Sequence, residues 1–162
     1  MLQNLNATKK GLITGVLMIG LSLILFYSGQ SFESPLQYSI YVVYAAGIVW
    51  SLYSFSKSAE NTNKFGAYFL QGFKCFVVVT LLMVLYTLAF NKLHPEFKDQ
   101  MGEAYKKELI SKGNKTPAEI ETTVKQAKDY YIVMLVSGAI FAYLIIGVVV
   151  TLVTTLMLRS RK

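Results

Sequence analysis

The sequence predicts an all-α membrane protein with four transmembrane helices and an extramembrane αα-hairpin between the third and fourth helices. Charged residues are absent from four long windows, 11–32, 34–56, 75–91 and 130–158, and roughly 20 apolar residues cross a bilayer as a helix. The only long hydrophilic region, 95–129, has the period of two amphipathic helices. We expect a single polytopic membrane domain over 1–162, with spans at about 11–28, 35–56, 71–92 and 131–158 and the hairpin at about 95–130.

The amino-acid composition excludes several classes of function for this protein. The net charge of +7 comes from clusters at the chain ends and loop edges, where the positive-inside rule explains it better than nucleic-acid binding does. The single Cys75 forms no intramolecular disulfide or thiolate cluster, and the single His94 has no ligand-spaced neighbour. No carboxylate lies deep in any span. We therefore expect no nucleic-acid partner, no metal, no cofactor and no catalytic residues.

The first span carries a G-x-x-x-G pair, Gly11 and Gly15, which lets helix backbones approach closely. This pair predicts either a homodimer face or, as we prefer, a helix–helix contact inside the bundle. Lys9 and Lys10 precede the span as in a signal peptide. The apolar segment is too long for a signal peptide and lacks a small-residue cleavage site, so we expect an uncleaved span.

The second span begins at Pro35, a residue suited to the first turn of a helix. Tyr38 and Tyr41 lie near one end of it, and Trp50 and Tyr53 near the other. This distribution is typical of the aromatic belts at the two membrane interfaces. A lipid-binding groove along the Tyr38 and Tyr41 face is the alternative.

The third span organises the chain, because its aromatic, amphipathic first half becomes an unbroken apolar run after Lys74. Phenylalanines follow helical spacing through that first half: Phe65, Phe69, Phe73 and Phe76. Lys74 would lie just inside the hydrocarbon and reach the interface with its long side chain. Gln71, Phe73 and Lys74 are therefore our candidates for lipid contact, with solute coupling as the alternative.

The hydrophilic region encodes two helices. One apolar face recurs every four residues from Phe97 to Leu109, and a second runs from Ile120 to Tyr131. Gly113 is a good helix stop. Thr116 and Glu119, with Pro117 in the first turn, predict a capping box at the start of the second helix.

The fourth span has small residues four apart, Gly147, Thr151 and Thr155. Rows of small residues are typical of close helix–helix contacts in membranes. We expect Gly147 and Thr151 to pack against the Gly11 and Gly15 face of the first span.

Orientation depends on the charges that flank the spans. Four spans place both termini on one side. Lys9 and Lys10 precede the first span, whereas the following loop carries only Glu33. The positive-inside rule then predicts cytoplasmic termini and a periplasmic hairpin in a bacterial inner membrane.

Several short motifs resemble an uncharacterised Bacteroidota family of small inner-membrane proteins that carry a domain of unknown function. They are the opening from Lys10 to Ile13, the stretch 70–74 (Leu-Gln-Gly-Phe-Lys), the Pro95-x-Phe97 step and the turn from Thr116 to Ile120. Leu70 and Gly72 depart from the family's pattern, whereas Gln71, Phe73 and Lys74 fit it. The resemblance implies a fold and a location over nearly the whole chain, and no catalytic residues.

From these patterns we expect a non-enzymatic structural or accessory subunit of an envelope membrane complex. Its partners would be the lipid bilayer and another membrane protein or further copies of itself. The alternative is a small lipid or solute translocation factor that uses Gln71 and Lys74, and a membrane enzyme is the least supported reading.

Overall fold

The computed structural model describes residues 5–28 and 35–160, and all regular structure in these residues is helical. The elements are α1 (Ala7–Tyr27), the 3₁₀ turn η2 (Pro35–Gln37), α2 (Tyr38–Ser56), α3 (Phe65–Leu93), α4 (Glu96–Lys112), α5 (Pro117–Asp129) and α6 (Tyr131–Ser160). Four of them, α1, α2, α3 and α6, are long and apolar enough to cross a membrane. The expectation of four apolar helices in an all-helical chain is confirmed.

The helix ends follow from local chemistry. The Asn6 side chain accepts a 2.9 Å hydrogen bond from the Lys9 amide, so α1 begins at Ala7, before the predicted start at Gly11. The third helix also begins earlier than the predicted 71, because the aromatic stretch from Phe65 onward is continuous with the apolar run. Pro35 opens a 3₁₀ turn, and the α-helix starts at Tyr38.

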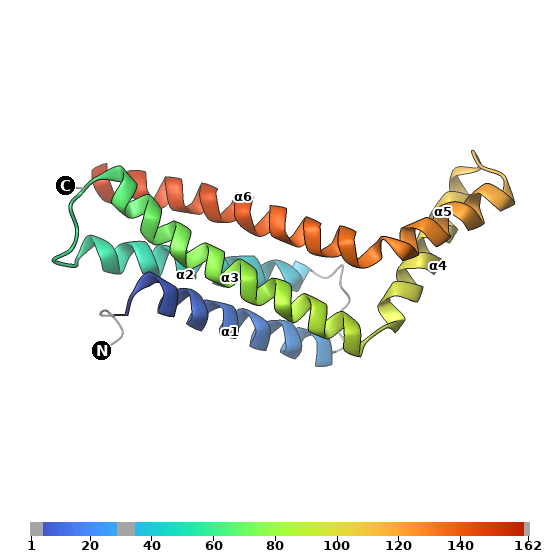
Figure 1. The fold of residues 1–162 in the computed structure, drawn as a ribbon, viewed down its shortest axis with the longest axis horizontal. Coiled ribbons are helices and arrows are strands. Elements are labelled where there is room, and N and C mark those ends of the chain that lie inside the picture. Colours follow the sequence, from blue (N-terminus) through green and yellow to red (C-terminus); the bar gives the residue numbers. More distant parts are fainter. Residues whose placement is uncertain (1–4, 29–34, 161–162) are drawn as a thin grey trace. The chain divides into compact units, whose positions relative to one another are not determined.

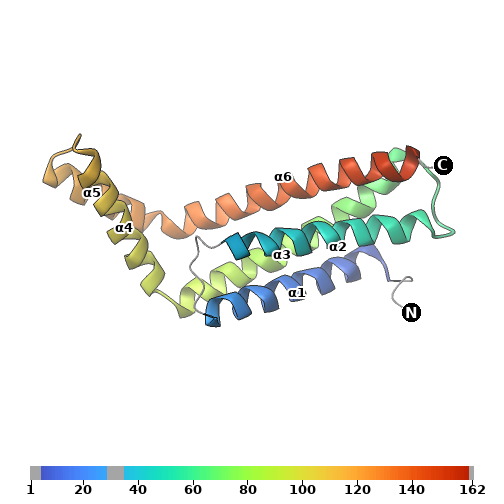
Figure 2. The same cartoon turned by 180° about the vertical axis from the view of Figure 1, so that it is seen from behind.

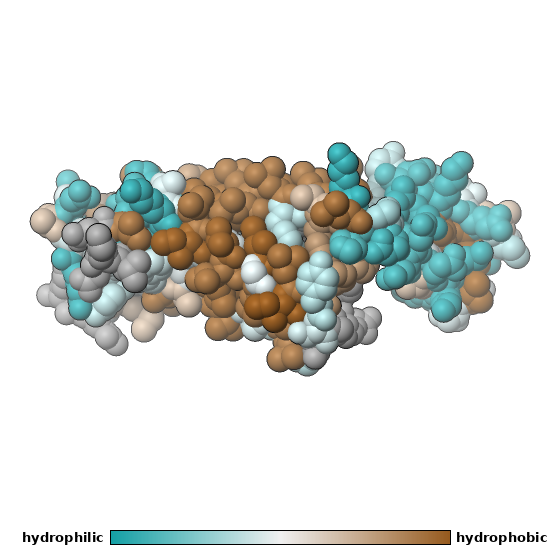
Figure 3. Space-filling view, turned by 90° about the horizontal axis from the view of Figure 1, so that it is seen from below, coloured by the Kyte–Doolittle hydropathy of each residue, from teal (hydrophilic) through white to brown (hydrophobic). Residues whose placement is uncertain are grey.

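The chain forms two compact units. The first, called the bundle here, comprises Met1–Val84 and Ile140–Lys162, and the second comprises Leu85–Ala139. Within the described part of the bundle, α1, α2 and the bundle parts of α3 and α6 run side by side (Figures 1 and 2). The start of α1 and the ends of α2 and α6 lie at the same end of it. On the face shown in Figure 3, hydrophobic residues cover much of the surface of these helices.

Glycines and small side chains bring the bundle helices together. A Cβ added at Gly11 would lie 2.6 Å from the Cys75 carbonyl oxygen, and one at Gly15 would lie 2.6 Å from the Leu82 side chain, so both glycines pack against α3. A Cβ at Gly147 would lie 2.6 Å from the Tyr44 hydroxyl of α2. The atoms nearest to these three glycines belong to α2 and α3, and the expected packing of Gly147 and Thr151 against the Gly11 and Gly15 face stays a prediction. Large side chains such as Tyr44 take up the space between α2 and α6.

The second unit, Leu85–Ala139, is called the α4–α5 unit here and has a small core of its own. Leu109 of α4 packs with Ile120 and Val124 of α5, and Tyr105 lies against this cluster. These residues belong to the two apolar faces that the sequence predicts. The capping box is confirmed, with the Thr116 hydroxyl accepting from the Glu119 amide and the Glu119 carboxylate accepting from the Thr116 amide.

Candidate functional site

The predicted lipid-contact residues lie on the outside of the bundle. Phe73 and Lys74 are exposed, and Gln71 is half-buried. The Phe73 ring continues a ladder along α3, 6.4 Å from the ring centroid of Phe69 and 5.3 Å from that of Phe76. Gln71, Phe73 and Lys74 therefore follow the helix surface and do not converge on an interior site. Their exposure suits contact with lipid.

The cation in the interior is Lys10. Only 3% of this residue is exposed, and its Nζ atom lies 5.6 Å from the centroid of the Trp50 ring. This distance is typical of a cation–π contact. Sequence reasoning missed this role, because Lys10 reads as one of two flanking charges before the first span. The sequence does contain a signal for the burial of Lys10. Lys10, Thr14 and Met18 are spaced four residues apart and therefore share one face of the helix, and all three are buried.

No carboxylate among the described residues accompanies Lys10. It forms no ion pair within 5–28 and 35–160, and Glu60, in the link between α2 and α3, is the single acid among the described residues of the bundle. Removing an ammonium group from water is costly unless an anion or hydrogen-bond acceptors replace its hydration. The electrostatics of this position favour a negatively charged group beside Lys10.

Buried polar side chains come from all four bundle helices. We call them the interior polar layer, and each is at most 3% exposed: Lys10, Thr14, Ser51, Cys75, Thr151 and Thr155. Direct contacts between these side chains and neighbouring helices connect the four helices. Thr14 packs against the Cα of Gly47, the Cys75 Sγ atom lies 3.9 Å from the Gly47 carbonyl oxygen, and Thr151 packs against Gly72.

Three hydroxyl groups of this layer have no hydrogen-bond partner among the described residues: Ser51 Oγ, Thr151 Oγ1 and Thr155 Oγ1. Ser51 lies next to the Cys75 thiol, but outside hydrogen-bonding geometry. Serine and threonine in helices commonly donate to the carbonyl four residues earlier. Thr14 does so to Lys10 at 2.9 Å and Thr80 does so to Phe76 at 2.8 Å. Ser51, Thr151 and Thr155 therefore hold hydroxyl donors that have no acceptor among the described residues.

Three members of the layer lie close to one end of the bundle, whereas Thr14, Cys75 and Thr151 lie seven to ten positions from the corresponding ends of their helices. Lys10 follows the first residue of α1 by three positions, and Ser51 and Thr155 precede the last residues of α2 and α6 by five positions each. At about 1.5 Å per residue, five positions correspond to roughly 8 Å. In a bilayer, groups at this depth lie near the boundary between hydrocarbon and headgroups.

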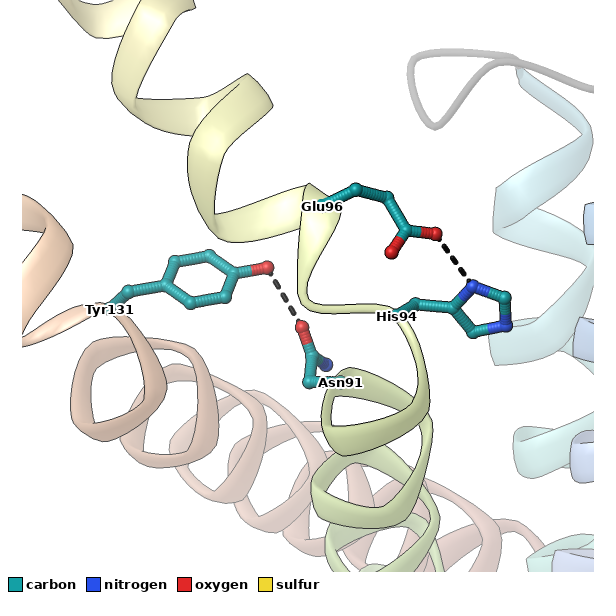
Figure 4. Close-up of polar contacts among 4 residues, drawn as sticks. All are labelled: Asn91, His94, Glu96 and Tyr131. Atoms are coloured by element: carbon teal, nitrogen blue, oxygen red, sulfur yellow. Dashed lines mark hydrogen bonds and ion pairs between the residues drawn. The ribbon is translucent and has the colours of Figure 1, made fainter.

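A second polar cluster lies in the α4–α5 unit, where α3 ends and α4 begins (Figure 4). The Tyr131 hydroxyl donates a 2.9 Å hydrogen bond to Asn91 Oδ1, and the His94 Nδ1 and Glu96 Oε1 atoms are 2.7 Å apart. The His94 ring also lies 4.7 Å from the ring centroid of Phe90. Hydrogen bonds from the backbone and then from His94 lower the pKa of Glu96. These contacts fix the turn between α3 and α4.

A shallow groove on the α4–α5 unit carries balanced charge. It is lined by Lys98, Lys106, Lys125 and Lys128 together with Asp99, Glu103, Glu121 and Asp129. Four cations facing four acids favour neither an anionic nor a cationic ligand. Within 5–28 and 35–160, no group of three or more His, Cys, Asp and Glu side chains could hold a metal ion.

Comparison with known proteins assigns the chain to a protein family. The family model described as "Protein of unknown function (DUF4199)" matches residues 9–160. No curated protein and no solved structure matches the chain.

Proposed function

Since the chain belongs to the DUF4199 family of proteins of unknown function, and has four helices apolar enough to span a membrane, we propose that it is a non-enzymatic accessory subunit of a membrane complex. It would lie in the bacterial inner membrane and hold a partner membrane protein through the outer face of α6. Its termini would be cytoplasmic and the α4–α5 unit periplasmic.

The observation that carries this proposal is the uneven burial of the four candidate spans. The most apolar 18-residue window of α6 has a mean hydropathy of 2.7 but is only 11% buried, compared with 33%, 44% and 28% for the windows of α1, α2 and α3. An exposed apolar row runs along its bundle part: Phe141, Ile145, Val149, Val153 and Leu156. Helices associate in lipid through side-chain packing. The α6 row therefore offers an unpacked apolar surface to a further helix.

Site-specific photocrosslinking in native membranes tests this role. A photoreactive side chain at Ile145, which is 62% exposed, should give a protein adduct of one defined mass. The same group at Leu17 of α1, 59% exposed, is the matched control for lipid contact, and Val79, fully buried, is the control for an interior position. If the products at Ile145 match those at Leu17, containing lipid but no protein, the accessory role is wrong.

The orientation can be tested with single cysteines. Ser111 of α4 and Ser160 of α6 are both exposed, so Ser111→Cys and Ser160→Cys should react equally in detergent. In intact spheroplasts a membrane-impermeant maleimide should label only Ser111→Cys. Labelling of Ser160→Cys alone would invert the proposed topology, and labelling of both would contradict four spans.

Lipid or solute translocation is a second candidate function, favoured by the interior polar layer. The sequence assigns this role to Gln71 and Lys74, but Lys74 is exposed whereas Lys10 is buried. Transport through the interior would therefore be lost in Lys10→Met and retained in Lys74→Met. Transport along the α3 surface predicts the reverse result in a reconstituted flux assay.

A further inference from the structure

The first half of α3 carries a surface that is both apolar and basic. Leu70, Phe73 and Lys74 are all exposed. Residues three and four apart are neighbours on a helix, so Leu70 lies between Phe73 and Lys74 on one side of α3. The Phe73 ring continues the ladder to Phe69 and Phe65, whose own ring centroids are 6.2 Å apart. We call Leu70, Phe73 and Lys74 the α3 patch.

Lys74 has no anionic partner in the described part of the chain. It forms no ion pair within 5–28 and 35–160. The described residues of the bundle include one acid, Glu60, against five exposed cations: Lys9, Lys57, Lys64, Lys74 and Arg159. An exposed cation beside exposed apolar side chains is complementary to an amphiphile with an anionic head.

Packing against α1 fixes the depth of Lys74 in the bundle. A Cβ added at Gly11 would lie 2.6 Å from the carbonyl oxygen of Cys75, the residue after Lys74. Gly11 is four positions from Ala7, where α1 begins, which corresponds to roughly 6 Å. The start of α3 lies at the same end of the bundle (Figure 1). Lys74 therefore lies about one helical turn inside this end, and its side chain can reach the lipid headgroups while its stem stays on apolar surface.

We propose that the α3 patch binds an anionic phospholipid. The Lys74 ammonium contacts the headgroup phosphate, and Leu70 and Phe73 contact the acyl chains. A zwitterionic lipid presents the same phosphate together with a cation, which the basic end of the bundle disfavours. This binding goes beyond the accessory role, because it concerns lipid on α3 and not protein on α6. Failure to crosslink through Ile145 would leave it unaffected.

Native mass spectrometry of the full-length protein, released from a maltoside detergent, counts the bound lipids. Dioleoyl phosphatidylglycerol and dioleoyl phosphatidylcholine have the same acyl chains and differ in the net charge of the headgroup. Titration of the two lipids in parallel therefore separates attraction to charge from hydrophobic contact. We expect the wild type to bind phosphatidylglycerol more tightly than phosphatidylcholine.

Lys74→Gln removes the charge at an exposed position on which folding does not depend. It should weaken phosphatidylglycerol binding about fivefold, the factor expected for one lysine at an anionic lipid surface, and leave phosphatidylcholine binding unchanged. Lys74→Arg keeps the charge and should keep the preference. Lys57→Gln is the matched control, because Lys57 Nζ lies 4.4 Å from the centroid of the Tyr53 ring on α2. It removes one charge from the same end of the bundle and should bind both lipids as the wild type does.

The apolar part of the α3 patch is tested separately. Leu70→Ser removes an exposed apolar side chain and should weaken both lipids several-fold and alike. Leu81→Ser is the control, since Leu81 is also exposed on α3 but lies further along the helix. It should leave both affinities unchanged.

Four results would overturn the proposal. The first is equal binding of the two lipids by the wild type, and the second is an unchanged preference in Lys74→Gln. The third is an equal loss in Lys57→Gln and Lys74→Gln, which would show diffuse attraction to the basic end of the bundle. The fourth is wild-type binding of both lipids by Leu70→Ser.

Discussion

The Tyr44 hydroxyl donates a 2.8 Å hydrogen bond to the main-chain carbonyl of Tyr143. Tyr44 is fully buried on α2, and Tyr143 is 8% exposed on α6. The two rings also meet edge to face, with centroids 5.4 Å apart. The hydroxyl reaches the carbonyl of a helix, and Gly147, one turn further along α6, leaves room for it. This single side chain therefore connects α2 to α6 in the bundle.

Tyr44→Phe removes that hydrogen bond and keeps the ring. Hydrogen bonds between helices in membranes are worth about 0.6 kcal/mol on average and up to about 1.7 kcal/mol. We expect a loss of stability in this range, measured by thermal unfolding in detergent with a size-exclusion readout. Tyr38→Phe, at a 70% exposed position of the same helix, is the control and should change little. Equal melting of both variants would show that the bond does not stabilise the bundle.

Gly72→Ala should destabilise the contact between α3 and α6. A Cβ at Gly72 would lie 2.5 Å from Thr151 Oγ1 and 3.0 Å from Thr151 Cβ, so the helices must separate. Overpacking of this kind costs about 1–3 kcal/mol. Gly20→Ala is the control, since nothing lies within 4 Å of a Cβ added there. Thr151→Ala in the Gly72→Ala background removes the closest atoms and should restore part of the melting temperature; no recovery would contradict the contact.

Much of the architecture can be predicted from the sequence because its signals are local. Charge-free windows mark the helices, and the capping box depends on residues three apart. The apolar face of α4 that includes Tyr105 and Leu109 meets the α5 face that includes Ile120 and Val124, because periodicity along a helix fixes which side chains share a face.

The candidate site depends on helix rotation, which the sequence signals only weakly. Lys9 and Lys10 are adjacent and chemically identical, but successive residues turn by about 100° on a helix. Lys9 is consequently exposed and Lys10 buried. A row of small residues also does not encode which helix packs against it, because a glycine leaves room for any neighbouring helix. Gly11 meets the Cys75 backbone of α3, and Gly147 of α6 meets side chains of α2 and α3.

Thr155→Val should leave stability unchanged or raise it. The Thr155 hydroxyl is fully buried without a hydrogen-bond partner in the described chain. An unsatisfied buried polar group costs about 1–3 kcal/mol, and an apolar group of the same shape avoids this cost. Thr80→Val is the matched control, because the Thr80 hydroxyl donates to the Phe76 carbonyl. Melting should therefore rise in Thr155→Val relative to Thr80→Val; the opposite order would show that Thr155 has a stabilising partner.

The Asp99–Lys128 ion pair should make the α4–α5 unit sensitive to acid. Lys128 Nζ lies 2.8 Å from Asp99 Oδ1, and the hydrogen bond from Lys128 lowers the pKa of Asp99 below its usual 3.8. A lowered carboxyl pKa means that the folded state binds its proton less tightly than the unfolded state. The contribution is therefore present above about pH 3.8 and is lost as the pH falls through the lowered pKa.

The same ion pair also sets an upper pH limit for its contribution to the stability of the α4–α5 unit. Asp99 raises the pKa of Lys128 above its usual 10.5, so the contribution is fully present below that pH and is lost as the pH rises through the raised value. Hydrogen exchange of α4 and α5 amides, corrected for intrinsic rates, should show greater protection at pH 7 than at pH 3, a difference that Asp99→Asn reduces.

Glu108→Gln is the control, since Glu108 pairs with Lys112 within α4 alone. It should loosen the end of α4 and leave the exchange of α5 unchanged, whereas Asp99→Asn should loosen both helices, because its partner Lys128 is on α5. An Asp99→Asn variant with the wild-type pH profile in α5 would show that the pair does not couple the two helices.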